Sequence, residues 1–290
     1  MSKRILNVAI VNWTILKQSQ QDILDRAGAL TRKAKEAGAD AIGFVEYFSI
    51  LGTGISSKAA AEIPGEGPVT AWAIALSKEH DIEIWCPFIE EGKKGDAYNA
   101  VAIIDPEDGI VGNFQEFHFF ELRTQGLEIG EAIQVIDRPW GKLGCFICYD
   151  IHFSEIPRAL SLQGAELVFW PTLTDGPYSI DHVRRKAQVR CMDHGFWMIE
   201  ANRNLSTIEN YPDIPSACIY NPEGEICHQV SQERELVIAP IDLSFRSKDI
   251  PSVEYSDFKN VDEATRYKRS LRPEYYADLF SSLPADKFER

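Results

Sequence analysis

The most informative part of this chain is the stretch KLGCFICYD, residues 142–150. An apolar strand is predicted from Leu143 to Cys148, and a helix is predicted to follow over Phe153–Gln163, where Gly164 ends it. This order places the Cys148 thiol at the carboxyl end of a strand, beside backbone N–H groups that can stabilise a thiolate or a developing oxyanion. Cys148 is therefore the candidate nucleophile. The alternative is a buried structural cysteine, which is the more common fate of an unpaired thiol.

Strands and helices alternate on both sides of this stretch. Apolar residues recur at spacings of three and four over Asp22–Ala37, which predicts an amphipathic helix, and Pro68 is placed in the first turn of another. A further helix is predicted over Asp181–His194. The predicted strands are Ile5–Trp13, Ala41–Val45, Ile82–Ile89, Tyr98–Ile104, Leu167–Trp170, Phe196–Glu200, Ala217–Asn221, Glu225–His228 and Leu236–Ile241. The alternation predicts an α/β protein in which helices cover the sheets of a single domain, residues 1–290.

Composition excludes several classes of partner. The 290 residues include 44 acidic and 30 basic side chains, which leave a net charge of −14 that repels nucleic-acid phosphate and anionic lipid. No stretch approaches the ~18 consecutive apolar residues of a membrane-spanning helix, and Asn7 and Asn12 interrupt the apolar run near the start. We therefore expect a cytoplasmic protein with six reduced cysteines and no nucleic-acid or membrane partner. The polar tail, residues 243–290, is expected to form an extended arm of the same domain.

A second candidate for chemistry is Glu46, which directly follows the predicted strand Ala41–Val45. Proteins of the α/β class collect functional groups at the carboxyl ends of strands, and a partly buried glutamate has a raised pKa suited to proton transfer. The alternative is an ordinary solvated charge at a strand end. Glu46 and Cys148 together form a candidate pair of base and nucleophile.

The chain resembles the nitrilase, or carbon–nitrogen hydrolase, superfamily over nearly its whole length. In that family a glutamate follows an apolar strand, as Glu46 does, and a cysteine lies in the motif GxxICYDxxFPE, which here reads GCFICYDIHFSE over 144–155. Further similar segments follow in the family's order: GAELVFWP over 164–171, Arg190 with the later ANR at 201–203, NPEGE over 221–225 and RPEYY over 272–276. Each match is weak alone, and the shared order makes the resemblance specific.

The resemblance implies a four-layer α-β-β-α sandwich that assembles as a homodimer or a larger homo-oligomer. It also implies hydrolysis, without cofactor or metal, of an amide, carbamoyl or nitrile carbon–nitrogen bond in a small molecule through a thioester on Cys148. In the family scheme a glutamate accepts the thiol proton, and a lysine ammonium stabilises the oxyanion together with the N–H that follows the cysteine. Glu46 and Tyr149 correspond to the first and the last of these groups.

The chain departs from the family at the position of the catalytic lysine. The segment GNFQEFHF, residues 112–119, aligns without a gap to the motif GxYRKxHL, and Glu116 stands where the lysine is expected. His118, interpreted as structural, keeps its family position and supports this register. A carboxylate removes an oxyanion donor worth roughly 3–4 kcal/mol and adds a like charge beside Glu46, so one of the two should hold a proton near neutral pH. We expect Glu116 within hydrogen-bonding reach of Glu46 or Cys148.

Several other side chains are candidates for the wall of a substrate pocket. Tyr47, Tyr149, Trp170 and Thr172 lie beside predicted strand ends, although core packing explains the three aromatic residues equally well. Glu121 and Glu128 both fall in the loop where family members carry an auxiliary carboxylate, and Glu121 is slightly preferred. Tyr47, Tyr149, Trp170, Thr172 and Glu121 are therefore interpreted as substrate-binding.

The leading interpretation is a hydrolase in which Glu46 is the base and Glu116 is either an altered acid or base or a disabled position. A nitrilase-like protein that has lost catalysis and binds a metabolite or a protein partner is the alternative, and an engineered lysine-to-glutamate change in an active amidase would have the same sequence. A redox or metal role for Cys145 and Cys148 is the weakest interpretation, because Cys145 lies inside the strand and should face elsewhere. We expect Cys148 to be the only thiol in a concave pocket.

Overall fold

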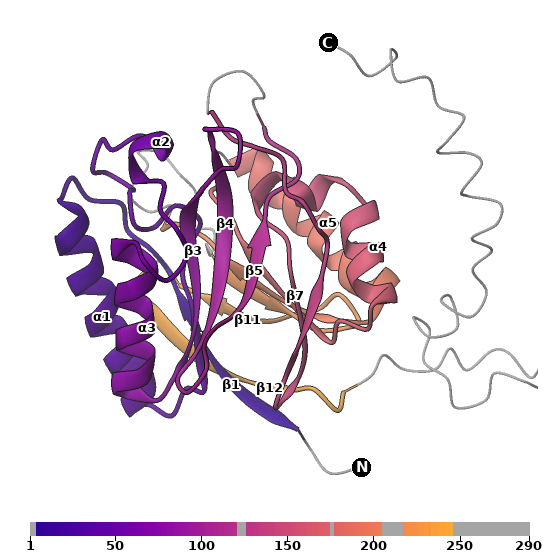
Figure 1. Ribbon diagram of the computed structural model, residues 1–290. Helices are drawn as coiled ribbons and strands as arrows, with labels where there is room; N and C mark the ends of the chain where they lie inside the picture. Colours follow the sequence, from indigo (N-terminus) through magenta and orange to yellow (C-terminus); the bar gives the residue numbers. More distant parts are fainter. Residues whose placement is uncertain (1–3, 121–125, 175–176, 205–216, 232, 246–290) are drawn as a thin grey trace, which may run out of the picture.

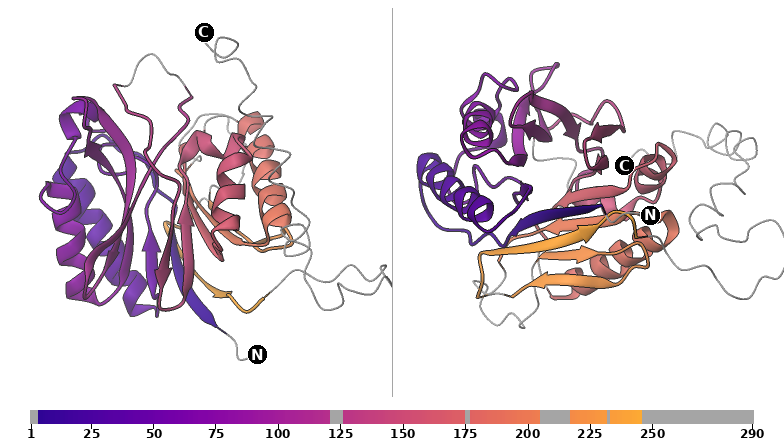
Figure 2. Two further views of the ribbon diagram at one scale, coloured as in Figure 1. Left: turned by 45° about the vertical axis from the view of Figure 1, so that its right-hand side comes forward. Right: turned by 90° about the horizontal axis from the view of Figure 1, so that it is seen from below.

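Two six-stranded sheets pack face to face, and helices cover the outer face of each (Figure 1, Figure 2). The computed structural model with this arrangement describes residues 4–120, 126–174, 177–204, 217–231 and 233–245. The expected four-layer α-β-β-α sandwich is confirmed. Glu121 and the part of the predicted arm beyond residue 245 lie outside the described residues.

The two sheets each contain six strands. Across the first sheet the order is β12 (Leu236–Asp242), β1 (Ile5–Val11), β2 (Ala41–Gly43), β3 (Glu83–Glu91), β4 (Ala97–Asp105) and β5 (Gly109–Gln115). Across the second sheet it is β11 (Ile226–Val230), β10 (Ala217–Tyr220), β9 (Trp197–Ala201), β8 (Leu167–Pro171), β7 (Gly141–Cys145) and β6 (Val135–Arg138). The helices are α1 (Gln20–Glu36), α2 (Ser57–Ala60), α3 (Pro68–His80), α4 (Glu155–Leu162), α5 (Pro177–His194) and a 3-10 turn over Cys148–His152.

Helices α1 and α3 cover the first sheet, and α4 and α5 cover the second (Figure 2). Among the residues that the structure describes, no helix is both long enough and apolar enough to cross a bilayer.

The middle of each sheet is parallel, and this brings the candidate residues to one region. Strands β1, β2 and β3 run parallel, as do β7, β8 and β9. Because the carboxyl ends of parallel strands meet at the same edge of a sheet, the loops that follow them collect there. Glu46 comes after β2 and Cys148 after β7, so the topology places both at such edges.

Alternation along the strands divides the core into layers. In β1, Val8 and Ile10 belong to the apolar cluster between the two sheets, whereas Ala9 and Val11 belong to the cluster beneath α1 and α3. Successive side chains of a strand point to opposite faces, so a strand covered on both sides is apolar throughout. Cys145 packs in the cluster between the sheets, which agrees with the prediction that it is buried.

Two predicted boundaries near the reactive segment are wrong. The strand predicted to reach Cys148 ends at Cys145, because the carboxylate of Asp150 accepts the N–H of Ile147 and the backbone turns there. The helix predicted from Phe153 begins only at Glu155. The edge strands β5 and β6 escape prediction, because they are largely half-exposed and mix glycine and polar residues with apolar ones.

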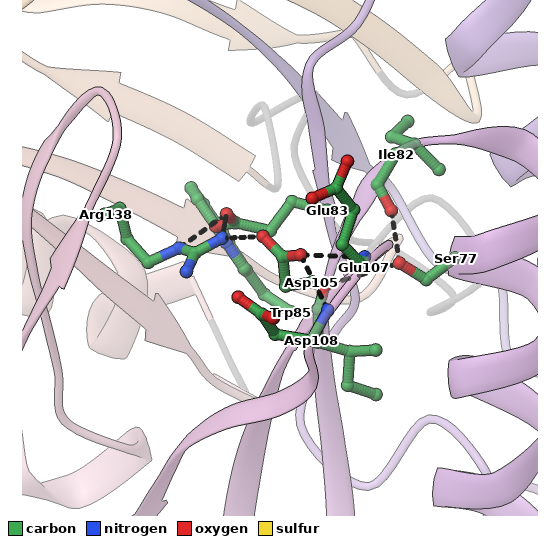
Figure 3. Close-up of polar contacts among 9 residues, drawn as sticks. Ser77, Ile82, Glu83, Trp85, Asp105, Glu107, Asp108 and Arg138 are labelled. Carbon is green, nitrogen blue, oxygen red and sulfur yellow. Dashed lines mark hydrogen bonds and ion pairs between the residues drawn. The ribbon is translucent and has the colours of Figure 1, made fainter.

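A buried ion network connects the two sheets (Figure 3). Arg138 on β6 donates through Nε to Glu83 of β3 at 2.8 Å, and its terminal nitrogen also pairs with Asp105 at the end of β4. Glu83 accepts a further hydrogen bond from Trp85 Nε1 at 2.7 Å. The side chains of Arg138 and Glu83 are each 7 % exposed, so these charges are compensated within the protein rather than by water.

Replacing Arg138 by methionine is expected to lower the free energy of unfolding by about 3–5 kcal/mol, because two carboxylates lose their buried counterion. Equilibrium unfolding in urea measures the loss. Lys142→Met is the matched control: Lys142 pairs with Asp137 at the surface, with its side chain 44 % exposed, and its removal should cost at most about 1 kcal/mol. Equal losses in the two variants would show that the network does not hold the sheets together.

Candidate active site

A cavity of about 410 Å³ collects residues that follow four strands. Glu46 comes after β2, Glu116 after β5, Cys148 after β7 and Thr172 after β8. The described residues that line it are Glu46, Tyr47, Glu116, Phe119, Phe120, Cys148, Tyr149, His152, Thr172, Leu173, Thr174, His182 and Val183. The three residues predicted as catalytic therefore lie around one cavity.

Cys148 is held at the cavity by a strained turn. Its φ angle is 46°, in the left-handed region that a non-glycine residue adopts at a cost of roughly 1–3 kcal/mol. The carboxylate of Asp150 accepts the N–H of Ile147 at 3.2 Å, and Trp170 Nε1 donates to the carbonyl oxygen of Cys148 at 3.1 Å. These contacts stabilise the turn. All of the cysteines are described, and Cys148 is the one that lines the cavity, as predicted.

Glu46 is almost fully enclosed beside this thiol. It is 2 % exposed, its Oε1 accepts a hydrogen bond from Asn99 Nδ2 at 2.8 Å, and its Oε2 has no well-formed hydrogen bond. Burial raises the pKa of Glu46 to about 7, and the contacts with Cys148 and Asn99 act in the opposite direction. A carboxylate with this pKa can accept and return a proton near neutral pH.

Asn99 joins the two carboxylates of the site. Its Nδ2 donates at 2.8 Å to Glu46 Oε1 and at 2.8 Å to Glu116 Oε2. A carboxylate oxygen of each glutamate and the sulfur of Cys148 lie within 4.8 Å of one another. Glu116 thus lies close to Glu46 and Cys148, but the contact between the two carboxylates that the structure describes runs through the Asn99 amide rather than through the expected direct hydrogen bond. Burial, followed by the charge of Glu46, raises the pKa of Glu116 well above its usual value.

Sequence reasoning missed Asn99, although the sequence contains a signal for it. Asn99 is 1 % exposed and interrupts the apolar interior of β4, AYNAVAIID. An amide buried in such a run has to find hydrogen-bond partners, because leaving it unpaired is costly. In this fold the available acceptors are the two carboxylates.

His118 connects the segment of Glu116 to the turn of Cys148. Its Nδ1 lies 2.9 Å from Asp150 Oδ1, and its ring stacks on Phe153 with centroids 3.5 Å apart. Asp150 is fully buried and also accepts the backbone N–H of His118 at 2.9 Å. The interpretation of His118 as structural agrees with these contacts, which help to set the position of Glu116 relative to the thiol.

The predicted wall residues divide into two groups. Tyr47, Tyr149 and Thr172 line the cavity, whereas Trp170 does not, and that prediction is wrong. Trp170 is fully buried in the cluster with α4 and α5, because alternation along β8 turns it to the helix side of the sheet. The wall residues that sequence reasoning missed are Phe119, Phe120, His152, Leu173, Thr174, His182 and Val183.

The described wall of the cavity contains no lysine or arginine. Lys186 of α5 does not line the cavity, but its Nζ lies 2.7 Å from Nδ1 of the wall residue His152. Burial, followed by the positive charge of Lys186, lowers the pKa of His152 to about 4, so this ring is neutral at neutral pH. No lysine or arginine of the described wall therefore balances the charge of Glu46 and Glu116.

A carboxylate beside a cysteine thiol, at the strand ends of an α-β-β-α sandwich, is an arrangement of base and nucleophile suited to covalent catalysis. Comparison with known proteins identifies the class of enzyme. The carbon–nitrogen hydrolase family matches residues 7–248. The chain therefore belongs to this family, as the order of its motifs predicts, and it is a hydrolase of carbon–nitrogen bonds.

Individual relatives agree with this assignment. An omega-amidase from Xenopus tropicalis is 28 % identical over 235 residues, which cover 77 % of this chain and 83 % of that protein. A carbon–nitrogen hydrolase from Helicobacter pylori G27 has a similar structure, with a TM-score of 0.74 at 17 % identity over 95 % of this chain and 98 % of that one. An amidase from Nesterenkonia sp. has a TM-score of 0.73 at 19 % identity over 94 % and 96 % of the two chains.

Proposed function

We propose that the protein hydrolyses a non-peptide carbon–nitrogen bond of a small molecule through a covalent intermediate on Cys148, with Glu46 as the base. One observation carries this proposal: a buried carboxylate with a pKa of about 7 lies beside the thiol that lines the cavity. Similar proteins support it, since one is an omega-amidase and another is an amidase whose active-site cysteine carries the acetamide moiety of fluoroacetamide.

Each step uses a group that faces the cavity. Glu46 accepts the thiol proton while the Cys148 sulfur bonds to the substrate carbon, and the π electrons of an amide C=O move to oxygen. Glu46 returns the proton to the departing nitrogen, the C–N bond breaks and a thioester remains. Water that gives a proton to Glu46 hydrolyses the thioester and restores the thiol. The N–H of Tyr149, which follows Cys148 in the turn, is the backbone oxyanion donor.

Glu116 has two candidate roles in this scheme. As a working acid or base it would hold a proton and donate a hydrogen bond to the substrate, and as a disabled position it would suppress attack by the sulfur. Burial, followed by the charges of Glu46 and Glu116, raises the pKa of Cys148 well above its usual value. This observation favours a second candidate function, a binding protein of the same fold, unless a substrate changes the charge of the cavity.

Mass spectrometry of Cys148 tests the proposal. Incubation with a panel of amides, nitriles and carbamoyl compounds, followed by acid quenching, is expected to leave an adduct on Cys148. Cys227 is the exposed thiol of the chain, so Cys227→Ala is the matched control and should keep the adduct that Cys148→Ala loses. A complete lack of adduct, or labelling confined to Cys227, would contradict the hydrolase and favour the binding protein.

The proposal includes a homodimer or larger homo-oligomer in the cytoplasm. Helices α4 and α5 expose the apolar side chains Leu162, Val189 and Met192, whereas α1 and α3, both fully described, expose no large apolar side chain. Apolar side chains gathered on one outer layer favour burial against a second copy. The six cysteines are all unpaired, which supports a reducing compartment.

Sedimentation velocity at micromolar concentration is expected to give a dimer or a larger species. Combining Val189→Glu with Met192→Glu should shift the protein towards the monomer, because each new charge would be desolvated in the interface. Leu16→Glu is the control, since Leu16 is equally exposed, at 48 %, but lies far from α5 in the sequence and outside the helical layers. A monomeric wild-type protein would contradict the assembly.

A further inference from the structure

The charge of the cavity does not suit the stabilisation of an oxyanion. Glu46 and Glu116 both face it, and the described wall has no lysine or arginine. Asp150 adds a third buried carboxylate nearby, which is paired with His118. The backbone N–H of Tyr149, the candidate oxyanion donor, interacts with the carboxylate of Glu116. A negative charge developing on a substrate would therefore meet like charge from whichever of these carboxylates is ionised.

The same groups are suited to bind hydrogen-bond donors. Asn99 holds one oxygen of each glutamate, which fixes the orientation of both carboxylates. Glu46 lines the cavity beside Cys148 and the backbone of Leu173, and its buried Oε2 has no well-formed hydrogen bond, so an N–H group that entered between the two glutamates would find an acceptor there. The wall also carries the aromatic side chains of Tyr47, Phe119, Phe120 and Tyr149, and the faces of such rings attract cations.

We propose that the reacting group of the substrate is a planar N–C–N cation, an amidinium or a guanidinium, that lies between Glu46 and Glu116 with its carbon facing Cys148. This inference rests on the proposed function and names its substrate class. The N–H groups of such a cation meet carboxylate oxygens in charge-assisted hydrogen bonds. A neutral amide offers an NH2 group to one carboxylate but no positive charge, and its oxygen is left facing the other carboxylate.

The change of charge during the reaction favours the cation as well. Addition of sulfur to an amide carbon creates an oxyanion, which an ionised Glu116 repels. Addition to an amidinium carbon neutralises the positive charge and creates no anion. Burial is the largest cause of the raised pKa of Cys148, and the charges of Glu46 and Glu116 come next. A bound cation opposes these carboxylate charges, so the reactive thiolate would form when substrate is present.

The reaction balances for an amidinium. The Cys148 proton passes to Glu46, sulfur bonds to the central carbon, and the C=N π pair moves to nitrogen. Glu46 protonates one nitrogen, which leaves as ammonia with the electrons of the C–N bond, while the lone pair of the other nitrogen forms a thioimidate cation. Water gives a proton to Glu46 as it bonds to carbon, and the C–S bond then breaks with its electrons on sulfur. The hydroxyl proton returns to sulfur, Glu46 protonates ammonia, and the products are an amide and ammonium.

Binding to the full-length Cys148→Ala variant separates recognition from turnover. Propionamidinium and propionamide have the same shape, but the cation carries an NH2 group where the amide carries its oxygen. Methylguanidinium and methylurea form a second pair of this kind. Titration calorimetry is expected to show each cation binding about tenfold more tightly than its neutral partner. Glu116→Gln in the same background should abolish most of this preference. Glu90→Gln should leave it unchanged, because Glu90 is also held by amide side chains but lies outside the cavity wall.

Turnover of the same compounds by the wild-type protein completes the test. Propionamidinium is expected to release ammonia, yield propionamide and leave a thioimidate on Cys148. Equal or tighter binding of the neutral compounds would overturn the inference, and adducts formed by the amides would then leave the proposed hydrolase standing. If no compound forms an adduct while the cations still bind more tightly, the proposed hydrolysis fails and the cation preference stands. A stoichiometric divalent metal that Glu116→Gln removes would also overturn the inference, because the ion would occupy the space between the carboxylates and Cys148.

Discussion

Replacing Cys148 by alanine is expected to lower kcat/KM by roughly a thousandfold or more for every substrate that the protein hydrolyses, because the sulfur that forms the covalent intermediate is lost. Ammonia release under steady-state conditions measures this loss. Binding of substrate should persist, since Glu46, Glu116 and the bridging Asn99 are unchanged. The effect should therefore fall on kcat far more than on the dissociation constant.

Cys145→Ala is the matched control for this variant. Cys145 lies three residues earlier, 5 % exposed, in the apolar cluster between the sheets, and does not line the cavity. Its replacement should change stability more than activity, because it removes a packed sulfur from a dense core. Retained activity in Cys148→Ala, with an unfolding curve like that of the wild type, would exclude Cys148 as the nucleophile.

Replacing Glu116 by lysine is expected to raise kcat/KM for neutral amides by roughly 10²–10³-fold, the range that mutagenesis assigns to one oxyanion donor. An ammonium group at this position would pair with Glu46. The substitution would also remove the Glu116 carboxylate, whose charge adds to the effect of burial in raising the pKa of Cys148. Alkylation of the thiol by iodoacetamide should therefore begin at lower pH. The same variant should lose activity towards amidinium compounds, because like charges would meet. Kinetics with propionamide and propionamidinium, together with the pH dependence of alkylation, measure these changes.

Glu116→Met separates the loss of a negative charge from the gain of a positive one. Methionine is similar in length and neutral, so amide hydrolysis by this variant should lie between that of the wild type and that of Glu116→Lys. A fall in amide hydrolysis in Glu116→Lys, with unchanged unfolding, would instead identify Glu116 as a working acid or base. In that case the wild-type rate should fall as pH rises and the proton shared by the two carboxylates is lost.

Local sequence patterns were sufficient to predict a helix or strand where one face of the segment is buried and the other is exposed. The three-and-four spacing over 22–37 predicts α1, which begins two residues earlier because the Oγ of Ser19 accepts the N–H of Asp22, whose carboxylate in turn accepts the N–H of Ser19. The edge strands β5 and β6 have weaker patterns, because one side of each is half-exposed and their registers depend on neighbouring strands. Glu116 was nevertheless positioned correctly at the cavity, since it follows β5 in an ungapped motif that includes His118.

The amino-acid sequence alone was enough to predict the alternation of strands and helices, the order of the family motifs, the proximity of Glu46 to Cys148 and the presence of Glu116 at the position where the resemblance implies a lysine. These features depend on short-range periodicity and on residue identity. The tertiary structure decided that Asn99 bridges the two glutamates and that Trp170 supports Cys148 from outside the cavity. Both contacts join residues distant in the sequence, and buried amide and indole N–H groups take whichever acceptor the packing brings within reach.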